Sequence, residues 1–128
     1  EIALQRPHAH ELLLSPVLSP GHASYPSGHA TQAHLIARVV GDLVLVNLPA
    51  AARNVMSRHL DRLAERIARN REIAGLHYPS DTAGGQALAQ NIFAALDNTL
   101  QADLDLAPDQ RKLPTFHAAI TAAQEEWP

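Results

Sequence analysis

The chain lacks cysteine and long hydrophobic runs. Without cysteine, disulfides are excluded and the sequence does not indicate a redox compartment. The best apolar stretch, residues 35–48, is interrupted by Arg38, Asp42 and Asn47, and it falls short of the roughly 20 apolar residues that a membrane-spanning helix needs. We therefore expect no membrane span and a soluble protein, with the compartment left open between the cytoplasm and the periplasmic or secreted space.

An excess of positive charge is also absent. The formal net charge is −3, which argues against a nucleic-acid-binding surface, so any positive field must be local to a pocket. The 128 residues suffice for a single domain with a real core. No segment alternates polar and apolar residues with a period of two for long enough to predict a strand, so the fold class is expected to be all-α.

Apolar spacing and prolines predict where the helices lie. We expect helices at residues 29–45, over a short segment beginning at Pro49, and over the residues that lead to Arg71. A stripe after Asp81 is expected to be core, and it consists of Leu88, Ile92, Leu96 and Leu100. Residues 108–128 are expected to form a linker, bracketed by Pro108 and Pro114, and a last helix that Thr115 caps and that ends at Glu126.

Residues 25–29, with the sequence Tyr-Pro-Ser-Gly-His, are the most informative segment. Ser27 can donate a hydrogen bond to an oxyanion, and Gly28 lets the backbone approach a ligand with no Cβ in the way. Gly28 and His29 are expected to begin a helix, where unpaired N–H groups and the positive end of the dipole favour an anion. His29 can exchange a proton with a bound group near neutral pH.

A second set of residues supplies charge and another imidazole. Arg6 and Arg71 stay charged and present planar forks of donors that match an oxyanion. Pro79 suits the first turn of a helix, which places His77 just before that helix and Asp81 inside its first turn. Asp81 can then fix the tautomer of His77, whose other ring nitrogen is left to attack phosphorus or to ligate a metal. These residues together predict a pocket for a tetrahedral or trigonal-bipyramidal oxyanion.

The ordered motifs resemble the signature of a superfamily that comprises type-2 phosphatidic acid phosphatases, bacterial non-specific acid phosphatases and vanadium haloperoxidases. The Pro-Ser-Gly-His part is intact at residues 26–29. The part made of Arg, five residues, His, three residues and Asp is intact at residues 71–81, with Asn70 in place of a Ser. Of the part made of Lys, six residues and Arg-Pro, the chain has residues 6–7, and the expected Lys would lie just upstream of Glu1.

The resemblance implies a role for each matching residue. His77 corresponds to the phosphatase nucleophile, or to the vanadium ligand of a haloperoxidase, and Asp81 orients it. His29 corresponds to the acid–base partner that protonates the leaving group or assists peroxide binding. The oxyanion cradle is implied to consist of Arg6, Arg71, Ser27 and the Gly28 amide.

The resemblance also implies a helical bundle of the acid phosphatase and haloperoxidase type. Its first helices would lie upstream of this chain, so we expect an earlier part of the same protein, or a second chain, to complete the bundle. The chain is then the C-terminal portion of one domain, residues 1–128, and a homo-oligomer is compatible with this arrangement.

Two enzymatic functions and one other function fit these motifs. A vanadate-dependent haloperoxidase, oxidising halide with hydrogen peroxide, is slightly favoured, because His22 stands where bromoperoxidases place a second histidine. The absence of cysteine and the single Met56 also suit an enzyme that releases an oxidant. The alternative is a soluble acid phosphatase that hydrolyses phosphomonoesters through a phosphohistidine without a cofactor. A non-catalytic remnant or interaction module, motivated by the absent Lys, is the third.

Overall fold

The chain is helical throughout most of its described part. The structure, a computed structural model, describes residues 6–7 and 23–126. Its first helix, α1 (Gly28–Arg38), continues into the π-helical turn η2 (Val39–Val44) and the 3-10 turn η3 (Leu45–Asn47). The later elements are α2 (Ala50–Ile73), α3 (Pro79–Leu104), the 3-10 turn η4 (Pro108–Gln110) and α4 (Pro114–Glu126). No strand occurs in this part of the chain, and the predicted all-α class is confirmed.

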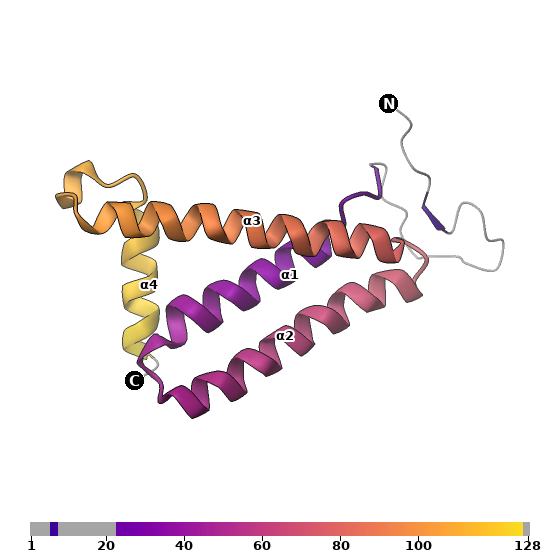
Figure 1. Ribbon diagram of the computed structural model, residues 1–128, viewed down its shortest axis with the longest axis horizontal. Coiled ribbons are helices and arrows are strands. Elements are labelled where there is room, and N and C mark those ends of the chain that lie inside the picture. Colours follow the sequence, from indigo (N-terminus) through magenta and orange to yellow (C-terminus); the bar gives the residue numbers. More distant parts are fainter. Residues whose placement is uncertain (1–5, 8–22, 127–128) are drawn as a thin grey trace.

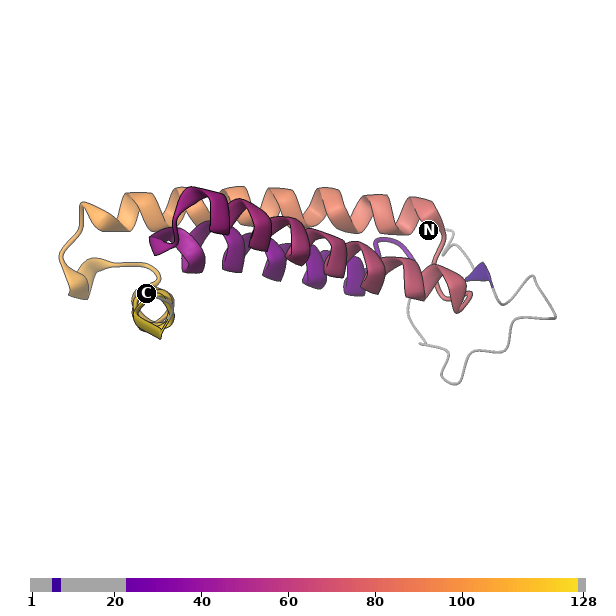
Figure 2. The same cartoon turned by 90° about the horizontal axis from the view of Figure 1, so that it is seen from below.

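Three helices, α1, α2 and α3, lie side by side in a thin layer, as Figure 1 and Figure 2 show. α1 is the middle helix and packs along both α2 and α3, whereas α2 and α3 have few contacts with each other. α4 crosses one end of the layer, where it packs against η2 and η3. The described helices therefore form a layer rather than a closed bundle. That an upstream part or a partner chain completes a bundle stays a prediction.

Small side chains set the close spacing within this layer. The buried positions include the alanines at 30, 37, 64, 68 and 89. Gly85 of α3 lies against the start of α1, and a Cβ added at Gly85 would come within 2.6 Å of the carbonyl oxygen of Ser27. Because only a residue without a side chain fits at Gly85, the first turns of α1 and α3 approach each other backbone to backbone.

The helix expected at residues 29–45 is regular over only part of that range. α1 ends at Arg38, and the backbone widens into η2 before it tightens into η3. Gly41 is buried in η2, and a Cβ at Gly41 would lie 3.0 Å from Ser57 Oγ of α2. A π turn widens a helix locally, and a periodicity argument that assumes regular α-helical spacing does not detect it.

Residues 50–73 form one continuous helix rather than a short helix followed by a second one. Pro49 directly precedes α2, as expected of a residue that cannot lie in a helix interior. No Gly or Pro interrupts residues 50–73, and Ala, Arg, Leu and Met favour the helix throughout. The prediction of a separate short helix was therefore wrong.

Prolines also begin α3 and α4. Pro79 is the first residue of α3, and Asp81 lies in its first turn, as predicted. α4 begins at Pro114, so Thr115 lies inside its first turn and is not its cap, which corrects that expectation. The end of α4 at Glu126 agrees with the prediction.

The leucine and isoleucine stripe of α3 is only partly core. Leu100 is buried, but Leu88 and Ile92 are 39% and 38% exposed. α1 is the helix that packs along α3, and no described helix covers the outer side of these two turns. The assignment of the whole stripe to the core was therefore wrong for Leu88 and Ile92.

One predicted site residue and most of the loop before the site lie outside the described residues. His22, the predicted halide-site residue, is among them. Of the residues that precede α1, the structure describes Arg6, Pro7 and residues 23–27, and Gly28 is already the first residue of α1.

Candidate functional site

A sharp turn between α2 and α3 positions the second histidine. Gly75 has a φ of 68°, a left-handed conformation that commonly ends a helix and that glycine adopts without strain. The turn is closed by a hydrogen bond of 3.0 Å from the Leu76 amide to the Arg71 carbonyl oxygen. Leu76 and His77 are both buried behind this turn. The Arg71 backbone and the His77 side chain are thus held at the same end of the layer.

His77 and Asp81 form a buried pair. His77 Nδ1 lies 3.5 Å from Asp81 Oδ2, which is longer than an ordinary N–H···O hydrogen bond but close enough for the carboxylate charge to act on the ring. Asp81 is fully buried. Its Oδ2 also accepts a hydrogen bond of 2.9 Å from the Tyr78 amide. One carboxylate therefore caps α3 and faces the His77 ring.

Ser27 links the two halves of the candidate site through its backbone. The Ser27 amide donates a hydrogen bond of 2.9 Å to the Asp81 carbonyl oxygen. The Ser27 side chain is the N-cap of α1, and its Oγ accepts from the Ala30 amide at 3.4 Å. Ser27 is fully buried. The Ser27 hydroxyl oxygen therefore caps α1. A hydrogen bond from this hydroxyl to a ligand stays a prediction.

Gly28 and His29 are exposed in the first turn of α1. No atom beyond the neighbouring residues lies within 4 Å of the position that a Gly28 Cβ would occupy, so the space next to this turn is open. The first amides of a helix have no carbonyl partner within the helix, and they face this space with the positive end of the dipole. The local structure is therefore suited to an anion.

Arg6 joins the loop before α1 to the turn before α3. Its Nη1 donates to the Leu76 carbonyl oxygen at 2.7 Å, and its Nη2 donates to the Ala23 carbonyl oxygen at 3.3 Å. Burial and the charge of Arg71 lower the pKa of Arg6, and Asp81 opposes this shift. Part of the donor set that the sequence assigns to the oxyanion cradle is therefore used to hold the backbone.

Arg71 supplies the charge common to the site. It is half-buried at the end of α2, and its Nε is buried with no hydrogen-bond partner among the described residues. Its positive charge contributes to lowering the pKa of both Arg6 and His29. Two guanidinium groups and an imidazole thus share one positive field, which a bound anion would neutralise.

Both histidines of the site are held toward the neutral form. Burial, and then the charge of Arg6, lowers the pKa of His77, while Asp81 and a backbone hydrogen bond to Ser24 oppose the shift. Burial, and then the charge of Arg71, lowers the pKa of His29. A neutral imidazole is the form that can act as a nucleophile or as a base.

The structure therefore brings six of the predicted residues to one end of the layer, together with Gly28; the six are Arg6, Ser27, His29, Arg71, His77 and Asp81. Sequence reasoning missed the contribution of Ser24, which is fully buried and whose backbone hydrogen-bonds His77. Nothing in the local pattern singles out Ser24, because its role depends on backbone geometry. The sequence also gives no sign that the Leu76 carbonyl oxygen is a partner of Arg6.

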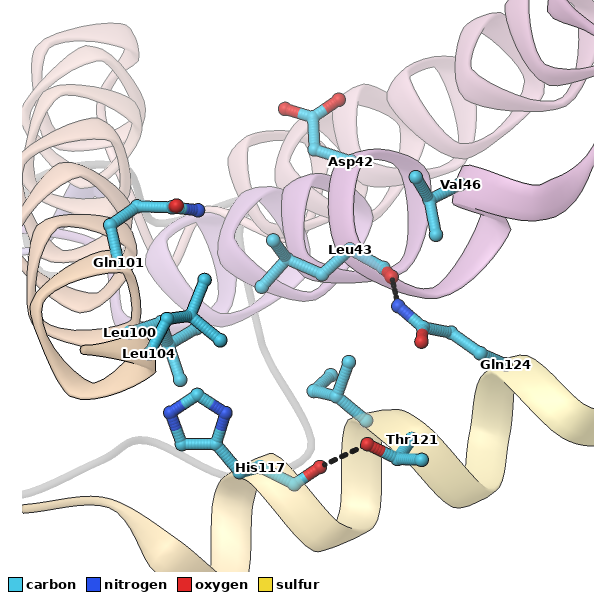
Figure 3. Close-up of a pocket in the computed structure, with 10 residues that line it drawn as sticks. Asp42, Leu43, Val46, Leu100, Gln101, Leu104, His117, Thr121 and Gln124 are labelled. Atoms are coloured by element: carbon cyan, nitrogen blue, oxygen red, sulfur yellow. Dashed lines mark hydrogen bonds between the residues drawn. The ribbon is translucent and has the colours of Figure 1, made fainter. Parts of the chain in front are cut away.

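A separate cavity of about 310 Å³ lies at the other end of α1, between η2, the end of α3 and α4 (Figure 3). Apolar walls from Leu43, Leu100 and Leu104 face the His117 ring across it. Gln124 Nε2 closes one side by donating to the Leu43 carbonyl oxygen at 2.6 Å. From His29 to Leu43 the helix rises by roughly 20 Å, so this cavity is not part of the candidate site.

No group of three or more His, Cys, Asp and Glu residues in the described part of the chain could hold a metal ion. No helix among residues 23–126 is long and apolar enough to cross a membrane.

Comparisons with known proteins point to a phosphatase. No protein-family model and no solved structure matches the chain. The chain is 33% identical over 94 residues to the decaprenylphosphoryl-5-phosphoribose phosphatase of two strains of Mycobacterium tuberculosis. The match covers 73% of this chain and 46% of the relative, so the chain spans about half the length of the curated relatives it matches. The chain is therefore similar to a phosphatase, and these comparisons give no support to the haloperoxidase that the sequence analysis favoured.

Proposed function

We propose that the chain carries the catalytic residues of a phosphatase that hydrolyses phosphomonoesters through a phosphohistidine at His77. The observation that carries this proposal is the buried pair of His77 and Asp81 beside the charges of Arg6 and Arg71. The similarity to a curated phosphatase supports the same reaction.

Binding would rely on charge and on the open first turn of α1. A phosphate dianion bound next to Gly28 meets unpaired helix amides, and the buried Arg71 Nε is a donor that the anion can satisfy. Arg6 adds positive charge while its own hydrogen bonds to Leu76 and Ala23 keep it in place. Developing charge on the equatorial oxygens is then stabilised by groups that are already oriented.

In the first chemical step, the lone pair of His77 Nε2 attacks phosphorus and forms an N–P bond. The bond from phosphorus to the ester oxygen breaks, and His29 gives its proton to the departing alkoxide, which leaves as an alcohol. Asp81 lies against Nδ1 on the opposite side of the His77 ring and stabilises the positive charge that the ring acquires.

In the second step, water replaces the histidine. Neutral His29 takes a proton from the water, the oxygen forms a bond to phosphorus, and the N–P bond breaks with its electron pair returning to His77 Nε2. Inorganic phosphate then leaves, and His29 releases its proton to solvent.

The lowered pKa of His29 is compatible with its role as an acid. In the ligand-free site, burial and Arg71 disfavour its protonated form. A bound phosphate dianion places negative charge next to His29 and offsets the charge of Arg71, which raises the pKa of His29 in the complex. Substrate binding would thus load the proton that the leaving group needs.

The name of the curated relative suggests a substrate class. That protein acts on a 5-phosphoribose that is linked to a decaprenyl phosphate. We propose that this chain likewise acts on a phosphomonoester of a sugar, with or without a lipid attached. Ribose 5-phosphate tests the sugar phosphate alone, and a lipid-linked sugar phosphate tests the need for the lipid.

The direct test is hydrolysis of 4-nitrophenyl phosphate by the wild type, by His77→Ala and by the control His59→Ala on the exposed surface of α2. We expect the His77 variant to lose activity by about a thousandfold or more, and the control to keep it. Vanadate, which shares the shape and charge of phosphate, is expected to inhibit the wild type. Halide oxidation with vanadate and peroxide but no phosphate release would favour the haloperoxidase, and neither activity would favour a non-catalytic module.

A further inference from the structure

Charges of opposite sign lie on different faces of α2. This helix carries six arginines and three acidic residues, although the net charge of the whole chain is −3. Asp61 and Glu65 line a groove that α2 shares with α1 and α3, so they point to the inner side of the helix. Glu72 is paired with Arg69. The three acidic residues of α2 therefore lie on or near its inner side, and the charged residues of its outer side are arginines.

The outer face of α2 is the side opposite the buried Ala64 and Ala68. With about 3.6 residues per turn, that side presents four arginines, and no acidic residue lies within it. One of the four, Arg69, is paired with Glu72 at its border. Apolar residues lie among the arginines, together with His59 and Asn70. We define the outer face by its three unpaired arginines, Arg58, Arg62 and Arg66, and by Val55, Leu63 and Ile73.

The side chains of the outer face are exposed and unpaired in the described part of the chain. Leu63 is 55% exposed and Ile73 is 66% exposed. The three arginines are exposed, and none of them makes an ion pair with a described residue. A water-facing helix ordinarily carries charges of both signs, and a protein core does not accept several unpaired arginines. This face fits neither environment.

The position of α2 leaves this face accessible. α2 lies along one edge of the layer with α1 on its inner side, and Figure 1 shows no described helix on its outer side. The helix has 24 residues, which gives it a length of about 36 Å. A straight basic and apolar surface of this length matches a helix that lies in the plane of a lipid interface.

We infer that the outer face of α2 binds the surface of an anionic membrane, with the helix parallel to the bilayer. Arg58, Arg62 and Arg66 would contact lipid phosphates, and Leu63 and Ile73 would enter between the headgroups. Arg71 and His77 follow at the C-terminal end of α2, so the candidate site would lie next to the membrane surface. This inference does not depend on the proposed phosphatase activity.

The test measures binding of the chain to lipid vesicles by sedimentation. Vesicles of phosphatidylcholine with about 30% phosphatidylglycerol are compared with vesicles of phosphatidylcholine alone. We expect binding to the anionic vesicles only, with affinity falling as NaCl rises from about 0.05 M to about 0.5 M. The triple variant Arg58→Gln, Arg62→Gln, Arg66→Gln is expected to bind about a hundredfold more weakly.

A matched control separates the outer face from net charge. The variant Gln90→Glu, Asn91→Asp, Gln110→Glu changes the charge by the same amount at exposed positions of α3 and η4, and we expect it to bind within about threefold of the wild type. The double variant Leu63→Ser, Ile73→Ser tests the apolar residues of the outer face. We expect it to bind the anionic vesicles more weakly than the wild type at the same NaCl concentration. Circular dichroism checks that each variant keeps its helices.

Two results would overturn the inference. One is the same vesicle binding, or absence of binding, for the wild type and the arginine variant. The other is a wild-type oligomer in solution that the arginine variant dissociates while vesicle binding is unchanged, because the outer face would then be covered by protein rather than by lipid.

Discussion

The Ser27 amide donates a hydrogen bond of 2.9 Å to the Asp81 carbonyl oxygen, and this bond joins the two motifs of the candidate site, which are more than 50 residues apart in the sequence. Gly85 lies one turn further along α3 and lets Ser27 come this close. The geometry of the site therefore depends on the contact between the first turns of α1 and α3.

Gly85→Ala tests that contact. The new Cβ would lie 2.6 Å from the Ser27 carbonyl oxygen and 2.9 Å from Ala30 Cβ, so α1 and α3 must move apart. We expect a loss of about 1–3 kcal/mol of unfolding free energy, measured by urea denaturation. Gly28→Ala is the matched control for stability, because no atom of another part of the described chain lies within 4 Å of its Cβ position. Equal stability of the two variants would contradict the packing described above.

Asp81→Asn tests the orienting carboxylate. An asparagine side-chain oxygen can still accept the hydrogen bond from the Tyr78 amide, but it cannot balance a positive charge on His77. We expect kcat for a phosphomonoester to fall by about a hundredfold or more, with KM changed much less. Because Asp81 raises the pKa of His77, the imidazole should titrate at lower pH in the variant, as read from its NMR shifts. Asp61→Asn is the surface control. A wild-type kcat in Asp81→Asn would show that Asp81 has no role in the mechanism.

The stability of the protein is expected to depend on the protonation of His77. Its pKa in the folded state lies below the ordinary value of 6.5, so the unfolded chain binds more protons when the pH drops below that value. The unfolding free energy should therefore be constant above about pH 6.5 and fall as the pH drops through the folded-state pKa. Denaturation at several pH values should show a smaller slope of unfolding free energy against pH for His77→Gln than for the wild type. An unchanged slope in His77→Gln would contradict the assignment.

Asp103 is expected to hold α4 in place. It is fully buried, and its two carboxylate oxygens accept from the Lys112 amide at 3.1 Å and the Leu113 amide at 2.9 Å. Burial alone would raise the pKa of Asp103, but these two hydrogen bonds, with the charges of His117 and Lys112, lower it overall. Asp103→Ala should cost about 2–4 kcal/mol of unfolding free energy and speed hydrogen exchange in α4, whereas the exposed Asp109→Ala should not. Slow exchange of α4 in Asp103→Ala would mean that other contacts dock it.

Local sequence rules predicted the start of α3 well. Pro79 suits the first turn of a helix, and its spacing from the other two residues places His77 just before that turn and Asp81 within it. The same rules failed for Leu88 and Ile92, because a helical stripe indicates an apolar face and does not indicate whether another helix covers it.

Features that depend on how closely distant backbone segments approach each other could not be predicted from the sequence. The widening at η2, the hydrogen bond of Arg6 with the Leu76 carbonyl oxygen, and the burial of Asp103 all follow from how distant segments meet. Ser27 shows the same limit in a residue that was singled out: its motif indicated a ligand contact, and the structure adds its role as the cap of α1. Motifs identify residue types. Whether a side chain stabilises the fold, acts on a ligand or does both can be seen only in the structure.

The most direct test of the proposed reaction is to trap the covalent intermediate. The protein is mixed with a phosphomonoester and quenched in base, where phosphohistidine is stable, and the modified residue is located by mass spectrometry. The account predicts a phosphoryl group on His77 of the wild type that accumulates further in His29→Ala when the leaving group is 4-nitrophenolate, because water then lacks its base. A phosphoryl group on another residue, or steady turnover with none on His77, would contradict it.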